Sequence, residues 1–250
     1  MFSERLIERL KKAYSIVALT GAGISAESGI PTFRGKDGLW NKYDPRELAT
    51  REAFERDPQL VWEWYLWRRK LVKEAKPNLG HYALVDLEDF IQDFVIITQN
   101  VDALHQIAGS KRVLDLHGNL FLNKCFDCGK LSRKKVESSR DIPTCDDCGG
   151  LLRPGVVWFG EQLNHKILQA AQEFSIQCEI MFVVGTSAEV EPAASLPSMA
   201  KGNGSYIVEI NPQPTPITSW VDESIHASAA EVLPALVVEV EKYRKRINIR

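Results

Sequence analysis

Four cysteines are spaced in a way that could bind a metal ion. They form two C-x-x-C pairs, Cys125 with Cys128 and Cys145 with Cys148, and residues 129–144 lie between the pairs. This spacing is typical of a zinc ribbon, in which four thiolates fill a tetrahedral shell and leave no position for water. The sequence therefore predicts one zinc ion with a structural role. Two disulfides are the alternative, which we disfavour because we expect no secretory signal at the N-terminus.

A glycine turn is the second feature that could do chemistry. Gly21, Gly23 and Ala26 follow the apolar run 15–20 and match the pattern G-x-G-x-x-A. In dinucleotide-binding folds such a turn brings backbone N–H groups close to a pyrophosphate at a helix N-terminus. We therefore expect a positive φ at Gly21 and close ligand approach at Gly23. A tight strand-to-helix turn without any ligand is the alternative.

The segment after this turn is unlike that of a dehydrogenase. In a dehydrogenase a second strand follows, and it ends in a carboxylate that holds the adenosine ribose. Residues 31–45 show no such strand and are rich in turn formers. Phe33 and Arg34 lie in this loop between Gly and Pro residues. A loop of this length in a compact domain is more often a binding segment than a spacer, so we expect it to close over a ligand.

Alternating strands and helices must position these loops. Apolar runs predict strands at 15–20, 94–98, 113–116, 180–184 and 206–210, and helical spacing predicts an opening helix behind Ser3 and helices at 102–108, 164–177 and 230–245. This order indicates an α/β fold with a doubly wound, Rossmann-like parallel sheet, whose ligand crevice lies at the carboxyl ends of the strands. Residues 47–90 keep a helical period, with Pro58 suited to a helix start.

These patterns divide the chain into two predicted domains. We assign residues 1–46, 91–120 and 153–250 to the Rossmann-like domain. Residues 47–90 form a helical insert and residues 121–152 the zinc-ribbon part of a small domain. The fifth cysteine, Cys178, falls at a predicted helix end, where we expect a buried, inert thiol.

Polar loops follow the predicted strand ends, at residues 99–102, 117–119, 185–187 and 211–212. His117 is the candidate general base among them, because histidine titrates near neutral pH. A hydrogen-bonded turn residue is the alternative for His117, and helix capping is the alternative for Asn100 and Asp102. No Ser/His/Asp or Cys/His spacing is evident, so the chemistry must come largely from a cofactor.

The charge composition gives no support for two kinds of partner. The 250 residues carry 31 basic and 33 acidic side chains, which nearly cancel and give no argument for binding nucleic acid or an anionic membrane. No apolar stretch approaches the 18 residues that a membrane helix needs. We therefore expect a cytoplasmic protein.

The motifs in their order resemble the sirtuins, the NAD-dependent protein-lysine deacylases. The matching segments, which cover almost the whole chain, are 21–34, 98–105, 117–119, the two cysteine pairs, 154–161, 185–187 and 209–211. The resemblance implies that an acyl-lysine amide oxygen attacks the ribose of NAD as nicotinamide leaves. It implies deacylated lysine, nicotinamide and O-acyl-ADP-ribose as products.

The resemblance also implies roles for single residues. His117 and Asn100 would be catalytic. The cofactor would be held by Gly21, Ala22, Gly23, Ile24, Glu27, Thr32, Phe33, Arg34, Trp40, Gln99, Asn100, Val101, Asp102, Gly185, Thr186, Ser187, Asn211, Pro212, Gln213 and Ala229. The acylated protein or peptide would contact Tyr65, Arg68, Val157, Trp158, Phe159, Gly160, Glu161 and Val190, pairing as an added strand.

Tyr65 and Arg68 add a prediction about the acyl group. They lie three residues apart on one helix face and resemble the pair that recognises the acid of succinyl- and malonyl-lysine in some sirtuins. The alternative is that Tyr65 packs among tryptophans while Arg68 is solvated. For the whole chain, an NAD-dependent oxidoreductase and a non-catalytic zinc-ribbon binding module are the alternative functions.

Overall fold

A computed structural model describes residues 1–35 and 38–246, so Lys36 and Asp37 of the predicted loop lie outside the described residues. Its main element is a six-stranded sheet in the order β3-β2-β1-β7-β8-β9, in which all pairings are parallel. The strands are β1 (Ser15–Thr20), β2 (Asp93–Thr98), β3 (Val113–Asp115), β7 (Ile180–Val184), β8 (Tyr206–Ile210) and β9 (Glu223–Ile225).

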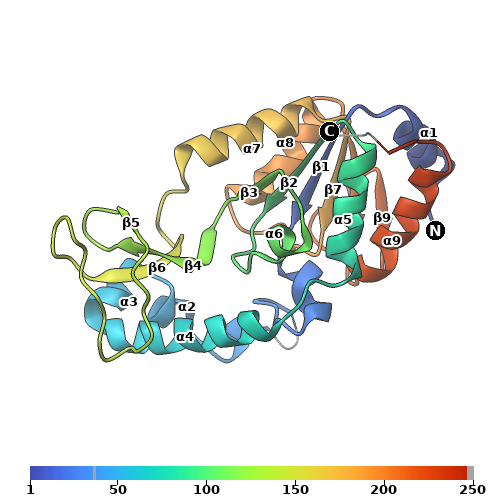
Figure 1. Cartoon of the computed structure of the whole chain (residues 1–250). Helices are drawn as coiled ribbons and strands as arrows, with labels where there is room; N and C mark the ends of the chain where they lie inside the picture. Colours follow the sequence, from blue (N-terminus) through green and yellow to red (C-terminus); the bar gives the residue numbers. More distant parts are fainter. Residues whose placement is uncertain (36–37, 247–250) are drawn as a thin grey trace.

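Helices cover both faces of this sheet (Figure 1). One face carries α1 (Glu4–Lys12), α5 (Leu79–Phe90) and α9 (Ala229–Glu241), and the other carries α7 (His165–Gln177) and α8 (Leu196–Gly202). Successive residues of β1 point to opposite faces, so Ile16 and Ala18 join one apolar cluster while Val17 and Leu19 join the other. This is the predicted doubly wound fold, because a parallel sheet needs both faces buried.

A second, antiparallel sheet lies at the other end of the molecule (Figure 1). It consists of β5 (Leu131–Ser132), β4 (Gly118–Cys125) and β6 (Leu152–Val156). It is accompanied by α2 (Pro45–Leu48), α3 (Arg51–Arg56) and α4 (Pro58–Glu74), whose buried residues share an apolar cluster with Leu120 and Val156 of the sheet. The short helix α6 (Leu104–Ala108) contributes Leu104 to the same cluster.

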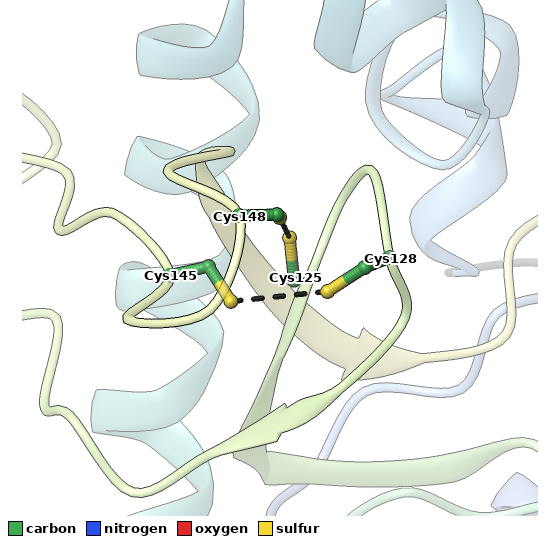
Figure 2. Close-up of side chains that lie close together, drawn as sticks. All are labelled: Cys125, Cys128, Cys145 and Cys148. Carbon is green, nitrogen blue, oxygen red and sulfur yellow. Dashed lines mark hydrogen bonds between the residues drawn. The ribbon is translucent and has the colours of Figure 1, made fainter.

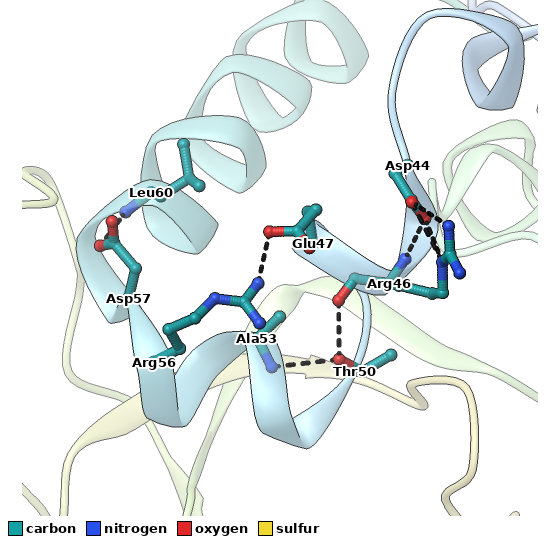
Figure 3. Close-up of polar contacts among 8 residues, drawn as sticks. All are labelled: Asp44, Arg46, Glu47, Thr50, Ala53, Arg56, Asp57 and Leu60. Carbon is teal, nitrogen blue, oxygen red and sulfur yellow. Dashed lines mark hydrogen bonds and ion pairs between the residues drawn. The ribbon is translucent and has the colours of Figure 1, made fainter.

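Side-chain caps fix where the three helices of the small domain begin (Figure 3). Asp44 accepts a hydrogen bond from Arg46 N at 2.8 Å, Thr50 from Ala53 N at 3.1 Å, and Asp57 from Leu60 N at 2.9 Å. Each cap satisfies a backbone donor that the first helical turn leaves free, which stabilises a helix by about 1 kcal/mol. Short polar segments therefore break this region into three helices that can turn around the small sheet.

Most predicted elements are confirmed within two or three residues. The strands at 15–20, 180–184 and 206–210 match, α1 begins behind the Ser3 cap, α4 begins at Pro58, and Gly109 ends α6 in a left-handed conformation. The fifth cysteine, Cys178, is buried at the end of α7 as expected. Strand β9 and helix α8 were not predicted, because neither the polar stretch around 223 nor the Pro-containing stretch around 197 has a clear period.

The division into domains stays a prediction, but the packing crosses its boundaries in two places. Helix α5 was assigned to the helical insert, whereas its buried residues pack with α9 in the main core. Strands β4 and β6 pair with each other across the predicted boundaries at 120 and 153. A helical period shows that a segment has one apolar face, but not which core covers that face.

No helix among the described residues is long and apolar enough to cross a membrane.

Candidate active site

A cavity of about 570 Å³ lies where the main sheet meets the small domain. The register of the parallel strands brings its loops together, because Thr20 lies beside both Thr98 and Val184, and Val184 beside Ile210. The predicted site residues on its wall are Gly21, Ala22, Gly23, Thr32, Phe33, Arg34, Trp40, Tyr65, Arg68, Gln99, Asn100, Val101, His117, Val157, Trp158, Phe159, Gly160, Glu161, Gly185, Thr186, Ser187, Val190, Asn211, Pro212 and Gln213. The four strand-end loops therefore form one site, as the sheet topology predicted.

Four predicted cofactor residues lie behind this wall instead. Ile24 is fully buried, and Ala229 is buried at the start of α9. The exposed Glu27 accepts a hydrogen bond from the backbone of Ala230 at 3.3 Å. Asp102 is 5% exposed and accepts a 2.8 Å hydrogen bond from Ser25.

The glycine turn has a different geometry from the one expected. Gly21 has φ −125°, so it is extended rather than left-handed, and our prediction of a positive φ is wrong. A Cβ atom on Gly21 would lie 2.6 Å from Thr186 Cβ, and one on Gly23 would lie 2.7 Å from Gly185 Cα. Gly23 N donates to Gly185 O at 2.8 Å. Glycine is required at both positions because the glycine turn and the loop after β7 lie too close together for a Cβ atom.

His117 is half-buried on the cavity wall, in the loop after β3. Its Nδ1 lies 3.0 Å from the carbonyl oxygen of Gln99. A carbonyl can only accept a hydrogen bond, so Nδ1 carries the proton and Nε2 is left as an acceptor. Burial lowers the pKa of His117 below its usual 6.5, an effect that the hydrogen bond to Gln99 opposes. The imidazole is therefore neutral at pH 7 and able to take a proton.

A polar network lies under the cavity floor. Asn100 Nδ2 donates to Ser25 Oγ at 3.2 Å, and Ser25 in turn donates to Asp102. Burial raises the pKa of Asp102, while its hydrogen bonds to Leu104 N and Ser25 lower it. The network holds the Asn100 amide in one orientation, because Ser25 links that amide to the Asp102 carboxylate.

Two further histidines lie in this network, and both are neutral at pH 7. Burial lowers the pKa of His81 to about 4 and that of His105 to about 3. His105 Nε2 lies 2.9 Å from Thr20 Oγ1, and His81 Nδ1 accepts from Asn78 N at 3.3 Å. Neither residue lines the cavity, so His117 is the histidine with access to a ligand.

Tyr65 and Arg68 close the small-domain end of the cavity. Tyr65 is 2% and Arg68 is 7% exposed. The Arg68 guanidinium carbon lies 4.8 Å from the ring centre of Phe33 and 4.9 Å from that of Trp64. Among the residues that the structure describes, this guanidinium has no hydrogen bond or ion pair. The solvated Arg68 of the alternative interpretation is therefore wrong.

Several cavity residues escaped the sequence analysis, namely Gly35, Ala49, Trp64, Val156, Leu163, Glu191, Pro214 and Thr215. Ala26, the last residue of the glycine-turn pattern, also lines the cavity. Trp64 matters most, because it stacks on Trp40 at 5.7 Å and edge-on against Tyr65 at 4.7 Å. Its position next to Tyr65 in α4 was the one available signal. Trp67, three residues further along α4, is 38% exposed and does not line the cavity.

The four cysteines of the small domain meet in space (Figure 2). Their Sγ atoms all lie within 4.8 Å of one another, with Cys125 and Cys148 at 3.4 Å and Cys128 and Cys145 at 3.8 Å. Tetrahedral zinc with Zn–S bonds of about 2.3 Å places sulfur atoms about 3.8 Å apart.

Two glycines shape the turns that carry these sulfurs. Gly129 and Gly149 have φ +72° and +78°, as the knuckle turns require. The cysteine set therefore fits one structural zinc ion, and the sulfurs are too far apart for the alternative of two disulfides.

The fold and this cavity define a Rossmann-like nucleotide-binding protein with a zinc-ribbon lobe. The model of the Sir2 family matches residues 21–192. An NAD-dependent protein deacylase of Aquifex aeolicus (strain VF5) is 57% identical over 209 residues, which cover 83% of this chain and 87% of that protein. This chain belongs to the Sir2 family.

Two solved structures show the same fold. A Sir2 homologue in complex with NAD has a TM-score of 0.89 and 49% identity, covering 97% of this chain and 95% of that chain. A Sir2 structure with deacetylated p53 peptide and 3'-O-acetyl ADP ribose has a TM-score of 0.84 and 35% identity, covering 98% of this chain and 100% of that chain.

Replacing Cys145 with Ala should release the metal and disorder residues 121–152, because a structural zinc site in a small lobe contributes about 10–16 kcal/mol to folding. Zinc content by elemental analysis and hydrogen exchange of the lobe measure this. Cys178→Ala is the matched control: it also removes a buried thiol, but it should retain one zinc per chain. A metal-free Cys145→Ala protein with full activity and an unchanged melting curve would overturn the assignment.

Proposed function

We propose that this chain catalyses the NAD-dependent removal of acyl groups from the lysine side chains of proteins. The observation that carries the proposal is one cavity that is lined by the glycine turn, Asn100 and a neutral His117, and also by the aromatic side chains of Tyr65 and Trp158. The Aquifex aeolicus relative is named for this activity, and a related structure holds a deacetylated peptide with an acetylated ADP ribose. Both support the same reaction for this chain.

The cofactor residues fall into groups according to the loop that carries them. Gly21–Gly23 and the loop after β7, residues 185–187, lie side by side and would hold the diphosphate and adenosine end of NAD, together with Asn211. Asn211 Nδ2 donates to Thr186 O at 2.9 Å, and this bond links the loop after β8 to the loop after β7. When bound, NAD supplies the ribose carbon that accepts the acyl oxygen.

The remaining groups exclude water and move protons. Phe33 and Trp40 pack at 5.1 Å between ring centres and cover the cavity from the loop that follows the glycine turn. His117 Nε2 is the acceptor for a hydroxyl proton, since its Nδ1–H is held by Gln99. We also propose that Asn100 orients a ligand group through the amide that Ser25 fixes.

An oxidoreductase is less well supported by the fold. Among the described residues no strand lies between β1 and β2, so the second strand with its ribose-binding carboxylate is missing. A non-catalytic zinc-ribbon module would leave the strand-end loops and their shared cavity without a role.

The acyl group is the finer part of the proposal. Burial lowers the pKa of Arg68, but a guanidinium stays protonated in proteins, so it is a buried charge that needs an anion. Among the described residues no carboxylate forms an ion pair with it, and the buried Asp102 favours its charged form only through a longer-range attraction. A terminal carboxylate on the acyl group, as in succinyl- and malonyl-lysine, fits this requirement, and acetyl-lysine still fits the same apolar cavity.

The protein substrate would enter between the two domains beside Val157–Glu161 and Ala188–Val190. The N–H groups of Val157 and Phe159 are already bonded to His117 O and Ala49 O, both at 2.9 Å. An added strand would therefore use the other backbone groups of these segments. We also propose a cytoplasmic location, where four free cysteines can bind zinc rather than form disulfides.

His117→Ala should lower deacylation by about 10²- to 10⁴-fold, because it removes one positioned base. NAD affinity should stay nearly unchanged, because the proposed base acts after the cofactor has bound. Steady-state kinetics with acyl-peptide at saturating NAD, together with calorimetry of NAD binding, measure the two effects. Wild-type turnover in the variant would remove His117 from the mechanism.

The same histidine predicts a pH dependence. Neutral His117 is the active form, and burial lowers its pKa below 6.5, so kcat/KM should be level at pH 7 and should fall only below pH 6.5. The pH profile of kcat/KM measures this, with a stability check by circular dichroism at each pH. An acid limb centred above pH 6.5 would contradict the prediction.

Arg68→Met should lower kcat/KM for succinyl-peptide by about 10- to 100-fold, because a charged hydrogen bond is worth about 1.5–3 kcal/mol. Acetyl-peptide should change only a few-fold, since methionine keeps most of the side-chain length and removes the charge. The two peptides are compared at one NAD concentration. Equal losses on both peptides would mean that Arg68 supports the fold instead.

A further inference from the structure

Trp158 makes a side-chain hydrogen bond that the motifs alone did not suggest. Its indole Nε1–H donates to the hydroxyl oxygen of Tyr65 at 2.9 Å, and both residues are 2% exposed. Trp158 follows β6 in the small domain, whereas Tyr65 lies in the middle of α4. The bond therefore joins α4 to the loop after β6 at the cavity wall that both residues line.

The direction of this hydrogen bond decides where the Tyr65 proton goes. An indole nitrogen is a donor only, so the phenol oxygen must accept and its own hydrogen must point elsewhere. Among the described residues the Tyr65 hydroxyl donates to none. Burial raises the pKa of Tyr65, so the phenol keeps its proton at neutral pH. A buried donor without an acceptor is left on the cavity wall, beside the unpaired guanidinium of Arg68.

Trp158 itself is held on two sides. The guanidinium carbon of Arg153, a residue that is 1% exposed, lies 3.7 Å from the centre of the Trp158 ring. Arg153 Nη2 donates to both carboxylate oxygens of Glu161, at 2.7 and 2.6 Å, and Glu161 also accepts from Trp158 N at 2.9 Å. Ring and backbone of Trp158 are thus fixed by the same ion pair.

We propose that Trp158 is a positioning residue for acyl specificity: its N–H occupies the Tyr65 oxygen and thereby directs the phenol proton toward the carboxylate of an acidic acyl group. The inference rests on the proposed function, because it needs the acyl group to end between Tyr65 and Arg68. It adds that Tyr65 and Trp158 act as one unit, with Arg153 and Glu161 holding the tryptophan in place.

A double-mutant cycle of Trp158→Phe and Tyr65→Phe tests the proposal. The readout is the ratio of kcat/KM for succinyl-peptide to that for acetyl-peptide. Trp158→Phe should lower this ratio about three- to tenfold, mainly through the KM of the succinyl-peptide, since a neutral hydrogen bond of this kind is worth a few-fold in binding. Once Tyr65→Phe is present, Trp158→Phe should change the ratio no further.

Matched variants separate the possible results. Trp67 lies in α4, the helix that carries Tyr65, but it is 38% exposed and does not line the cavity. Trp67→Phe should therefore leave the ratio unchanged. If Trp158→Phe does not fold, benzothienylalanine at position 158 keeps the ring shape and lacks the N–H, and the same loss is expected.

Two results would overturn the inference. The first is that the losses of Trp158→Phe and Tyr65→Phe add in the double variant, and the second is that Trp158→Phe leaves the ratio unchanged. If Arg68→Met still lowers the ratio, either result would mean that the indole only fills space. If Arg68→Met leaves the ratio unchanged as well, the acidic-acyl pocket itself fails together with the inference.

Discussion

The register of the parallel sheet is the constraint on which the site depends. Thr20 of β1 is level with Thr98 of β2 and with Val184 of β7, so the loops that follow these strands begin at the same height. The loop after β7 then meets the glycine turn so closely that no side chain fits between Gly23 and Gly185. A one-residue shift of any central strand would exchange its two faces and separate these loops. The cofactor end of the cavity is therefore a property of the sheet.

The end of the cavity that Tyr65 and Arg68 line depends instead on the small antiparallel sheet. Trp62 of α4 donates to Leu152 O at 2.9 Å, and Arg69 donates to Leu120 O at 2.8 Å. These bonds fix the rotation of α4 about its axis, which decides whether Tyr65 and Arg68 face the cavity. Four cysteines at the far end of the same small sheet order its strands. Zinc can thus matter to catalysis without touching the reacting atoms, by holding the sheet against which α4 packs.

Sequence patterns predicted those features that depend on nearby residues, such as strands and the loops that follow them. Continuous apolar runs identified the central strands, and the strand-end loops identified the polar cavity residues at one edge of the sheet, because the carboxyl ends of parallel strands must meet there. The other predicted cavity residues came from the resemblance to the sirtuins. The assignment of α5 failed because an amphipathic period does not name its partner. Gly21 was misjudged because its glycine requirement comes from contact with Thr186, more than 160 positions away in the chain, and not from its own φ.

Side-chain contacts between distant segments were also out of reach. The sequence placed Tyr65 and Arg68 on one face, but their burial also depends on Phe33 and Trp158, which lie in loops far from α4 in the sequence. Strand β9 escaped because three residues at a sheet edge carry too little pattern to be recognised. Such features follow from tertiary packing, which can override local propensity.

Burial has opposite consequences for the two titratable groups that the cavity shares. Excluding water lowers the pKa of either group, because it makes the charged form less favourable. Whether the group then loses its proton at pH 7 depends on its usual pKa. His117 has a pKa near neutrality, so burial leaves it unprotonated and ready to accept a proton. Arg68 cannot lose its proton near neutral pH, so the same exclusion leaves it a charge that seeks an anion. In one cavity, burial therefore favours a neutral His117 and leaves Arg68 charged, because an imidazole and a guanidinium differ in basicity.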